Sequence, residues 1–261
     1  MKKYLILFLM LLNIVSCNKK EKQEKPVLKT EVVQIENKEE KQEEKKEEKI
    51  EEKQKEDKNK KVVYLTFDDG PTKTTTLEVL RILKENDIKA TFFVIGQNPE
   101  IYKQIVEQGH KLEIHTYTHK YKEVYASVDS YFADLYRLRD LIKETTGLDP
   151  KIVRMPGGSS TTRASRELKK QILRRLKKEG FIFQDWNCDS KDASGKLFSP
   201  EEEAENSFCN FKKVNLLMHD TKKSTVLALQ HIIDKYKEHG YTFEVLTENS
   251  PKFQHMREPK D

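Results

Sequence analysis

Two adjacent aspartates, Asp68 and Asp69, end an apolar stretch within residues 65–72, which read LTFDDGPT. Neighbouring residues on a strand point to opposite faces, so we expect the two carboxylates to have different roles. Gly70 and Pro71 then end the strand and produce a turn. Two acids at a strand end are suited to proton transfer or metal binding, while turn capping is the structural alternative, because Asp-Gly is a frequent turn pair.

Two histidines, His115 and His119, stand four positions apart in the segment HTYTH. If this segment begins a helical turn, both imidazoles lie on one face and can coordinate a metal. Two histidines four positions apart also occur by chance on protein surfaces. A metal needs a third ligand, for which Asp69 is a candidate. One carboxylate and two imidazoles leave positions open for water and substrate, and they suit Zn²⁺ but also Co²⁺, Ni²⁺ or Fe²⁺.

The neighbouring Asp68 is then free to accept a proton from water near the cation. Arg154 could pair with Asp68 and hold its rotamer, or form an ordinary ion pair. Arg154 begins the segment RMPGG, in which Pro156 restricts the backbone and Gly157 permits close approach. The amide of Gly157 could therefore face an oxyanion, unless the loop simply needs to turn.

A third histidine, His219, follows a hydrophobic stretch in the segment LLMHD. It could be a core histidine with satisfied hydrogen bonds. An acidic partner such as Asp192 would instead raise its pKa and make it a proton donor.

These residues follow strand-like stretches that alternate with helix-like stretches. The expected strands are residues 62–67, 90–95, 111–114, 151–154, 181–186, 214–218 and 241–246, and the expected helices are residues 75–86, 99–108, 128–145, 163–179 and 224–237. The alternation predicts an α/β fold with parallel strands and helices outside them. Periodicity does not distinguish a closed β/α barrel from an open doubly wound sheet, but in both the ligand sites lie at the carboxyl ends of the strands.

The chain has 261 residues and a net charge of +5, but its charge is unevenly distributed. Residues 1–16 combine a basic start with a short apolar run, which predicts a signal peptide. The residues before Cys17 resemble a bacterial lipobox, in which the cysteine carries the lipid after cleavage. An uncleaved anchor helix and an ordinary secretory signal are the alternatives, and each of them takes the protein out of the cytoplasm.

Residues 17–60 are rich in Lys, Glu and Gln and predict a disordered or transiently helical spacer. Their Lys and Glu are nearly balanced, so no nucleic-acid partner is expected. Residues 61–250 have the composition of a folded domain, and residues 251–261 predict a loose C-terminal tail. Cys188 and Cys209 are equally compatible with a disulfide and with two free thiols.

The segment from residue 61 to about residue 246 resembles the polysaccharide deacetylase family, also called the NodB-homology domain or carbohydrate esterase family 4. The segments TFDDGP, HTYTH, RMPGG and LLMHD match the family's first, second, third and fifth motifs in order. This resemblance implies a distorted (β/α)7 barrel. It also implies the following site residues: a metal held by Asp69, His115 and His119, a base at Asp68 tethered by Arg154, and an acid at His219.

The chain departs from the family pattern in two places. The family often has an aromatic residue after the proline of motif three, where this chain has Gly157. The fourth motif often reads D-S-x-D-W, whereas residues 189–193 read DSKDA and Trp186 lies upstream. Aligned in this way Asp192 would orient His219, and residues 185–190, DWNCDS, offer a second alignment.

The resemblance implies hydrolysis of N-acetyl groups on an amino-sugar polysaccharide. A lipid anchor and spacer favour peptidoglycan N-acetylglucosamine as the substrate of a monomeric lipoprotein, either outside the cytoplasmic membrane or in the periplasm or outer membrane. An O-acetyl esterase of the xylan type and an inactive glycan-binding lipoprotein are the alternatives. Basic residues could attract anionic wall polymer or form the solvated side of a helix: Arg163, Arg166, Lys169, Lys170, Arg174, Arg175, Lys177 and Lys178.

Overall fold

The computed structural model describes residues 59–257. The predicted signal peptide, the predicted lipidation site Cys17 and nearly all of the predicted spacer lie outside the described residues. Among the residues that are described, no helix combines the length and the apolar character needed to cross a membrane.

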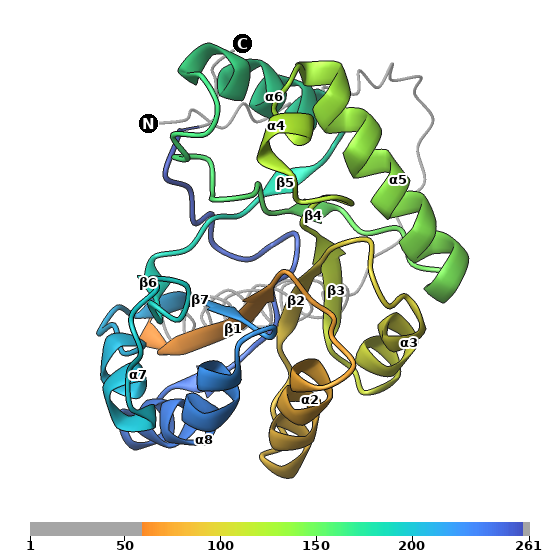
Figure 1. Ribbon diagram of the computed structural model, residues 1–261. Coiled ribbons are helices and arrows are strands. Elements are labelled where there is room, and N and C mark those ends of the chain that lie inside the picture. Colours follow the sequence, from red (N-terminus) through yellow and green to blue (C-terminus); the bar gives the residue numbers. More distant parts are fainter. Residues whose placement is uncertain (1–58, 258–261) are drawn as a thin grey trace, which may run out of the picture. The chain divides into compact units, whose positions relative to one another are not determined.

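One curled sheet of parallel strands forms the centre of residues 59–257 (Figure 1). The strands are β1 (Val62–Asp68), β2 (Thr91–Val94), β3 (Lys111–Ile114), β4 (Ile152–Val153), β5 (Ile182–Phe183), β6 (Cys188–Asp189), β7 (Lys213–His219) and β8 (Thr242–Phe243). Their order is β5-β4-β3-β2-β1-β7-β6, and β8 also pairs with β1. The architecture is the predicted distorted β/α barrel, and β6 is a strand that the sequence did not predict.

Strand β1 is the centre of this sheet, and all seven of its residues are buried. It pairs with β7 along its whole length, with β2 near its carboxyl end and with β8 near its amino end. Covering on both faces explains its nearly continuous apolar sequence. The β1–β7 register places Asp68 directly beside His219, so the first and last motifs meet at one sheet edge.

The barrel is distorted because β5 and β6 stand at opposite ends of the strand order, although they follow each other in sequence. Residues 184–187 join the two strands. The side chain of Arg154, fully buried, reaches this segment from the end of β4. Its guanidinium donates to the carbonyl oxygens of Gln184, at 3.2 Å, and Asp185, at 2.9 Å. A buried side chain thus satisfies carbonyl groups that a regular barrel would pair with a neighbouring strand.

Helices surround the sheet (Figure 1). They are α2 (Thr75–Glu85), α3 (Glu100–Glu107), α4 (Tyr121–Val124), α5 (Val128–Thr146), α6 (Arg166–Lys178), α7 (Pro200–Asn206) and α8 (Lys223–Glu238). The sequence predicted five of these and missed α4 and α7. For α7 a signal was present: Ser199 and Glu202 form a capping box, with Pro200 at the first helical position.

Cys188 and Cys209 form a disulfide, which decides between the two alternatives that the sequence left open. The bond joins β6 to the segment that follows α7. It therefore anchors β6, from which the segment containing Asp192 continues.

The prediction of a loose C-terminal tail is wrong for residues 251–257. Phe253 is buried against Tyr64, with the ring centroids 5.9 Å apart, and its carbonyl accepts the Asp185 N–H. The Met256 N–H donates to the Ser159 hydroxyl at 3.0 Å. The tail packs because it supplies partners for buried polar groups, and composition does not reveal such pairing.

Candidate active site

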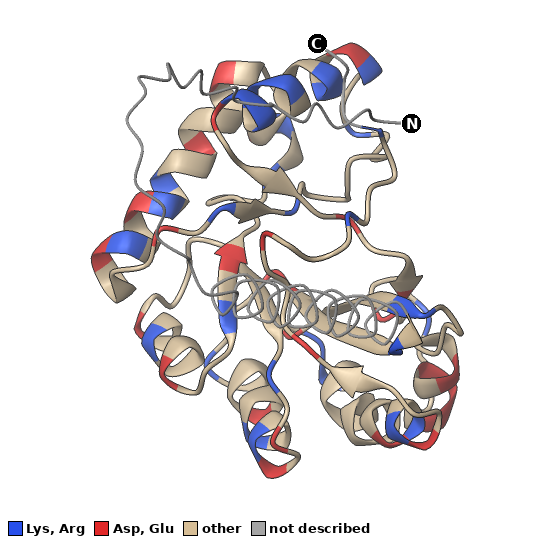
Figure 2. Ribbon diagram, turned by 180° about the vertical axis from the view of Figure 1, so that it is seen from behind, with Lys and Arg blue, Asp and Glu red and all other residues tan. Residues whose placement is uncertain are grey.

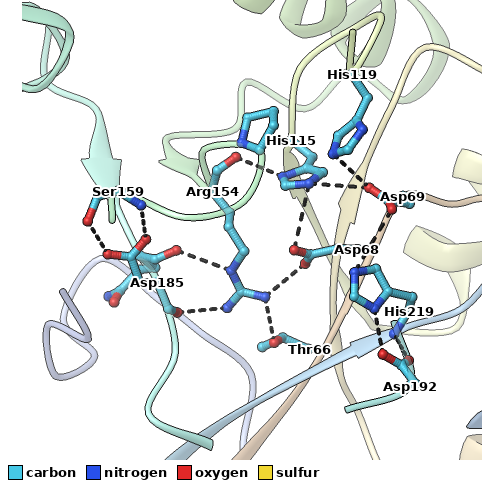
Figure 3. Close-up of polar contacts among 12 residues, drawn as sticks. Thr66, Asp68, Asp69, His115, His119, Arg154, Ser159, Asp185, Asp192 and His219 are labelled. Carbon is cyan, nitrogen blue, oxygen red and sulfur yellow. Dashed lines mark hydrogen bonds and ion pairs between the residues drawn. The ribbon is translucent and has the colours of Figure 1, made fainter. Parts of the chain in front are cut away.

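The two aspartates meet at the carboxyl end of β1, although the strand rule places them on opposite faces. The strand ends at Asp68, and Asp69 has a left-handed backbone (φ 71°), which turns its side chain into the same site. Gly70 allows the Asp220 side chain to pack closely against this turn, since a Cβ there would lie 2.1 Å from an Asp220 carboxylate oxygen. The two acids differ in their main partners: Asp68 binds Arg154 and lies 3.7 Å from His115, whereas Asp69 faces both His115 and His119 (Figure 3).

The segment from His115 to His119 is not helical, so the premise of an i,i+4 helical pair is wrong. The two imidazoles nevertheless lie together, with ring centroids 4.9 Å apart. Asp134 of α5 shapes this loop by accepting the backbone N–H groups of Tyr117, at 2.6 Å, and Thr118, at 3.2 Å. No pattern in the sequence connects Asp134 with the histidines, because only tertiary packing brings α5 to this loop.

The side chains of Asp69, His115 and His119 converge as a metal site requires. Asp69 Oδ1 lies 3.3 Å from His115 Nε2 and 3.2 Å from His119 Nε2, and the three potential ligand atoms lie within 4.8 Å of one another. That carboxylate oxygen is buried and has no hydrogen-bond partner among the described residues. The donor set therefore fits a divalent cation.

His115 is oriented for such a role by its other ring nitrogen. Its Nδ1 donates to the Arg154 carbonyl oxygen at 2.8 Å, which leaves the Nε2 lone pair facing Asp69. The three side chains differ in exposure: that of His115 is 3% exposed, whereas those of His119 and Asp69 are 24% and 28% exposed. The site is therefore closed behind His115 and open toward solvent on the side of His119.

The electrostatics of this cluster favour an added positive charge. Burial opposes ionisation of Asp69, but the close imidazole of His115 and the charges of His119 and His219 outweigh it and hold the pKa of Asp69 below its usual range. Burial also disfavours the charged form of His115, yet Asp68 and Asp69 raise its pKa. Burial and the neighbouring His115 lower the pKa of His119, which favours its neutral, metal-binding form.

The expected contact between Arg154 and Asp68 is present. Arg154 Nη1 lies 2.8 Å from Asp68 Oδ1 and 2.7 Å from the Thr66 hydroxyl, and Nη2 lies 3.0 Å from Asn215 Oδ1. Together with the two carbonyls of the β5–β6 segment, these acceptors fix the guanidinium plane. Thr66 and Asn215 were not predicted as site residues, since each lies inside an otherwise apolar strand.

His219 is held by Asp192, as the first alignment of motif four predicts. Its Nδ1 lies 2.8 Å from Asp192 Oδ1, and its backbone N–H donates to Oδ2 at 2.7 Å. Thr225 donates its hydroxyl to the same Oδ2 at 2.7 Å, a contact that the sequence did not predict. Burial opposes the charged imidazole, but the hydrogen bond and charge of Asp192 outweigh it and raise the pKa of His219 to about 9.

The other acids of the second alignment have different partners. Asp189 accepts from the Lys191 backbone and ammonium groups. Asp185 is buried, and its carboxylate accepts the N–H and hydroxyl of Ser159 and the N–H of His255. Asp185 thus ties the loop after Arg154 to the C-terminal segment, a role the sequence did not predict.

Pro156 and Gly157 occupy the centre of a tight turn in this loop. The Gly158 N–H donates to the Met155 carbonyl at 2.7 Å, and Gly157 has φ 71°, as the third position of a type II turn requires. Within residues 59–257 the Gly157 N–H has no hydrogen-bond acceptor. The amide is therefore available to a ligand at the predicted position.

Comparison with known proteins gives this geometry a context. Residues 55–180 match the family model described as polysaccharide deacetylase. The chain is 36% identical to the putative polysaccharide deacetylase YheN of Bacillus subtilis, covering 71% of this chain and 67% of that protein. The chain belongs to the polysaccharide deacetylase family. It is an enzyme of carbohydrate esterase family 4.

Two further relatives of this polysaccharide deacetylase carry more specific names. A peptidoglycan-N-acetylglucosamine deacetylase of Bacillus cereus is 35% identical, covering 74% of this chain and 72% of the relative. The crystal structure of the catalytic domain of a peptidoglycan N-acetylglucosamine deacetylase from Eubacterium rectale superposes with a TM-score of 0.71 at 36% identity, covering 77% of this chain and 94% of that one.

Trp186 lies near the two places where this deacetylase departs from the family pattern. Its ring packs on Gly158, one residue after Gly157, and meets the His255 ring edge-on with the centroids 4.7 Å apart. The indole therefore lies beside the turn of motif three. It reaches this position from the segment that joins β5 to β6, upstream of the segment in which Ala193 replaces the tryptophan of motif four.

Proposed function

We propose that this polysaccharide deacetylase removes N-acetyl groups from peptidoglycan N-acetylglucosamine in a reaction that requires one divalent cation. One observation carries the proposal. Asp69, His115 and His119 converge on one point, while Asp68 and His219 stand beside them as separate proton carriers.

A divalent cation at the Asp69, His115 and His119 cluster would lower the pKa of a water molecule and polarise the acetyl carbonyl. Zn²⁺ is our first choice for this ligand set, and Co²⁺, Ni²⁺ or Fe²⁺ can also use it. The unpartnered Asp69 Oδ1 and the oriented His115 support the assignment.

Asp68 accepts the proton of the attacking water. Its Oδ1 is held by Arg154, and its Oδ2 is directed toward the cluster, 3.7 Å from His115 Nε2. Arg154 holds this carboxylate through a charge-assisted hydrogen bond and prevents it from rotating away. The base is therefore held in position before the substrate binds.

His219 supplies the proton that the leaving nitrogen needs. The hydroxyl of water joins the acetyl carbon, the C–N bond breaks, and acetate and an amine are released. An amide nitrogen does not leave as an anion, so protonation by His219 accompanies this cleavage. Against the opposing effect of burial, Asp192 raises the pKa of His219 to about 9 and so favours the protonated imidazole that this step needs. The free Gly157 N–H would donate to the carbonyl oxygen as it becomes negative.

The substrate assignment is supported by the names of two relatives, the peptidoglycan-N-acetylglucosamine deacetylases of Bacillus cereus and Eubacterium rectale. We further propose that residues 1–16 are a signal peptide, that Cys17 carries a lipid, and that residues 17–60 tether a monomeric domain outside the cytoplasm. The Cys188–Cys209 disulfide supports export, because such bonds persist in oxidising compartments.

Acetate release from peptidoglycan and from chitin oligomers tests the reaction. The full chain should lose activity after chelation and regain it with Zn²⁺, and Asp68→Asn should reduce the rate at least about 100-fold, as loss of a general base does. Asp140→Asn, which removes an exposed acid on α5, is the matched control. Full activity in protein shown by elemental analysis to be free of metal would contradict the proposal.

Two measurements test the substrate and the anchor. Mass spectrometry of muropeptides from cells with and without the protein should show more acetylated glucosamine when it is missing, and unchanged acetylation would contradict the peptidoglycan assignment. Incorporation of labelled fatty acid should occur in the full chain and disappear in Cys17→Ala. Equal labelling of both proteins would place the lipid elsewhere.

A further inference from the structure

A second polar hollow, separate from the metal cluster, lies between α6 and the C-terminal segment. Its volume is about 680 Å³, and no Asp or Glu lines it. Its charged and hydroxyl lining consists of Ser160, Arg166, Lys169, Lys170, Arg174 and Arg257. We call this hollow the basic pocket. Figure 2 shows Lys and Arg gathered along α6, the helix that supplies four of these residues.

The cations of the basic pocket are poorly neutralised compared with their neighbours. Arg175, on another side of α6, binds both Asp129 and Glu179 at 2.8 Å. Among residues 59–257, by contrast, neither Arg166 nor Lys170 takes part in an ion pair, and the closest acid to Arg174 is Glu167, at 3.7 Å on the exposed helix surface. The pocket therefore gathers five cationic side chains, and the ion pairs of the described residues include one acid for them, Glu167.

Lys169 shows that this charge is built into the fold. Its side chain is buried, and its ammonium group donates to the Thr161 carbonyl oxygen without a carboxylate partner. Burial and the neighbouring charge of Arg166 lower the pKa of Lys169. Placing a lysine here is costly for stability alone, and an anionic ligand would offset the repulsion.

The basic pocket is connected to the active site through the loop of motif three. Ser160 follows Gly157 by three residues, so their Cα atoms are at most about 11 Å apart. The Ser160 hydroxyl lies 3.0 Å from His255 Nδ1, and His255 Nε2 lies 2.8 Å from the Trp186 carbonyl oxygen. The loop of motif three therefore carries both the free Gly157 amide and a residue of the basic pocket.

We propose that the basic pocket is a subsite for carboxylate groups carried by the same glycan strand that is being deacetylated. This inference rests on the proposed function, because it takes the strand in the active site as its ligand. Guanidinium and ammonium groups bind carboxylates through charge-assisted hydrogen bonds, and the Ser160 hydroxyl adds a partner for a sugar hydroxyl. The peptide substituents of a peptidoglycan strand carry such carboxylates, and chitin carries none.

The subsite also has a consequence for the product. Deacetylation converts a neutral amide into an ammonium group, which the cations of the basic pocket repel. Acidic, acetylated strands should bind better than strands that are already deacetylated. The enzyme would thus favour acetylated strands over its own product.

The double variant Arg166→Gln/Lys170→Gln tests the subsite, with Lys143→Gln/Lys178→Gln as a control that removes the same charge from exposed positions elsewhere. We expect KM for acidic peptidoglycan fragments to rise roughly tenfold, the effect of losing about 1.4 kcal/mol of charge-assisted contacts. The values of kcat and KM for chitin oligomers should stay unchanged in both double variants. Added salt should weaken binding of the acidic fragments by the wild type.

Binding of the acidic fragments to the Asp68→Asn protein, with and without the pocket substitutions, separates the subsite from the reaction. Loss of binding only with the pocket substitutions supports the subsite even if the proposed reaction fails. Equal effects on acidic and neutral glycans, or no effect on either, would overturn it. Unchanged glycan binding together with lost binding to anionic phospholipid vesicles or to inorganic phosphate would also overturn it and assign the pocket to those ligands.

Discussion

The Asp192–His219 pair allows a quantitative test of the proton donor. The change is Asp192→Asn, which keeps an oxygen that can accept the His219 N–H and removes the charge facing Nδ1 at 2.8 Å. His219 must be protonated to act as an acid. Activity should therefore fall as the pH rises through the pKa of His219, and this fall should occur at lower pH in the variant.

The size of the shift follows from the environment of His219. Its pKa is raised from 6.5 to about 9, a difference of about 2.5 units, which corresponds to about 3.4 kcal/mol. Burial opposes this rise, and Asp192 contributes more to it than Asp68 and Asp69 do. Since those two acids remain in the variant, we expect the alkaline limb to move by roughly 1 to 2 pH units toward acid.

The assay is the pH dependence of kcat/KM for acetate release from chitin oligomers, with both proteins loaded with the same cation. A bound cation lowers the pKa of His219 in either protein, so the difference between the two profiles is the quantity to compare. Asp189→Asn is the matched control, because Asp189 lies on the same segment and binds Lys191 instead of His219. A folded Asp192→Asn protein with an unmoved alkaline limb would refute the assignment of His219 as the acid.

Three further predictions concern stability. Arg154→Gln should cost about 3–5 kcal/mol in urea unfolding, because it leaves the buried Asp68 carboxylate without its partner. Burial raises the pKa of Glu113 to about 8, so the folded chain holds a proton that the unfolded chain releases near pH 4.5. Stability should therefore fall as the pH rises from 4.5 to 8, and Glu113→Gln should abolish this fall in Tm. Cys188→Ala/Cys209→Ala should lower the free energy of unfolding by about 3 kcal/mol, from closure of a loop of about 20 residues.

Matched controls make these stability measurements specific. Arg139→Gln removes an arginine whose partner is at the surface, and should cost less than about 1 kcal/mol. Equal losses for Arg139→Gln and Arg154→Gln would contradict the role of burial. Glu107→Gln, which removes an exposed acid, is the control for Glu113→Gln. If wild type, Glu107→Gln and Glu113→Gln all show the same dependence of Tm on pH, Glu113 is ionised in the folded chain. A disulfide variant as stable as the oxidised wild type would show that the bond does not constrain the unfolded chain.

The approximate positions of most secondary-structure elements follow from local patterns. Apolar runs fully buried in β1 and β7, and apolar stripes on the five longest helices, are properties of contiguous sequence. The sequence did not predict three short elements, α4, α7 and β6. Their formation depends on neighbours such as the Cys188–Cys209 bond and the Ser199 cap rather than on a repeating pattern.

The types of the candidate site residues were also evident in the sequence, because polar side chains at the ends of apolar strands are rarely placed there for stability. What the sequence did not contain was their mutual geometry. The side chain of Asp69 faces the histidines because Asp69 has a left-handed backbone conformation. His119 faces Asp69 from a loop that Asp134 of α5 holds in shape. The choice between the two alignments of motif four, and with it the assignment of Asp192 as the partner of His219, required the three-dimensional contacts.

The sequence by itself thus determined the chemistry that is available: which acids, imidazoles and cations exist and which strand ends carry them. Only the tertiary structure decided which of them touch, that the final residues pack on the domain, and that the charges of α6 line a hollow beside the motif-three loop. The physical reason is that strand and helix periodicities depend on residues a few positions apart. Hydrogen bonds such as those of Arg154 to Thr66 and Asn215 join residues 88 and 61 positions away, and no local pattern encodes them.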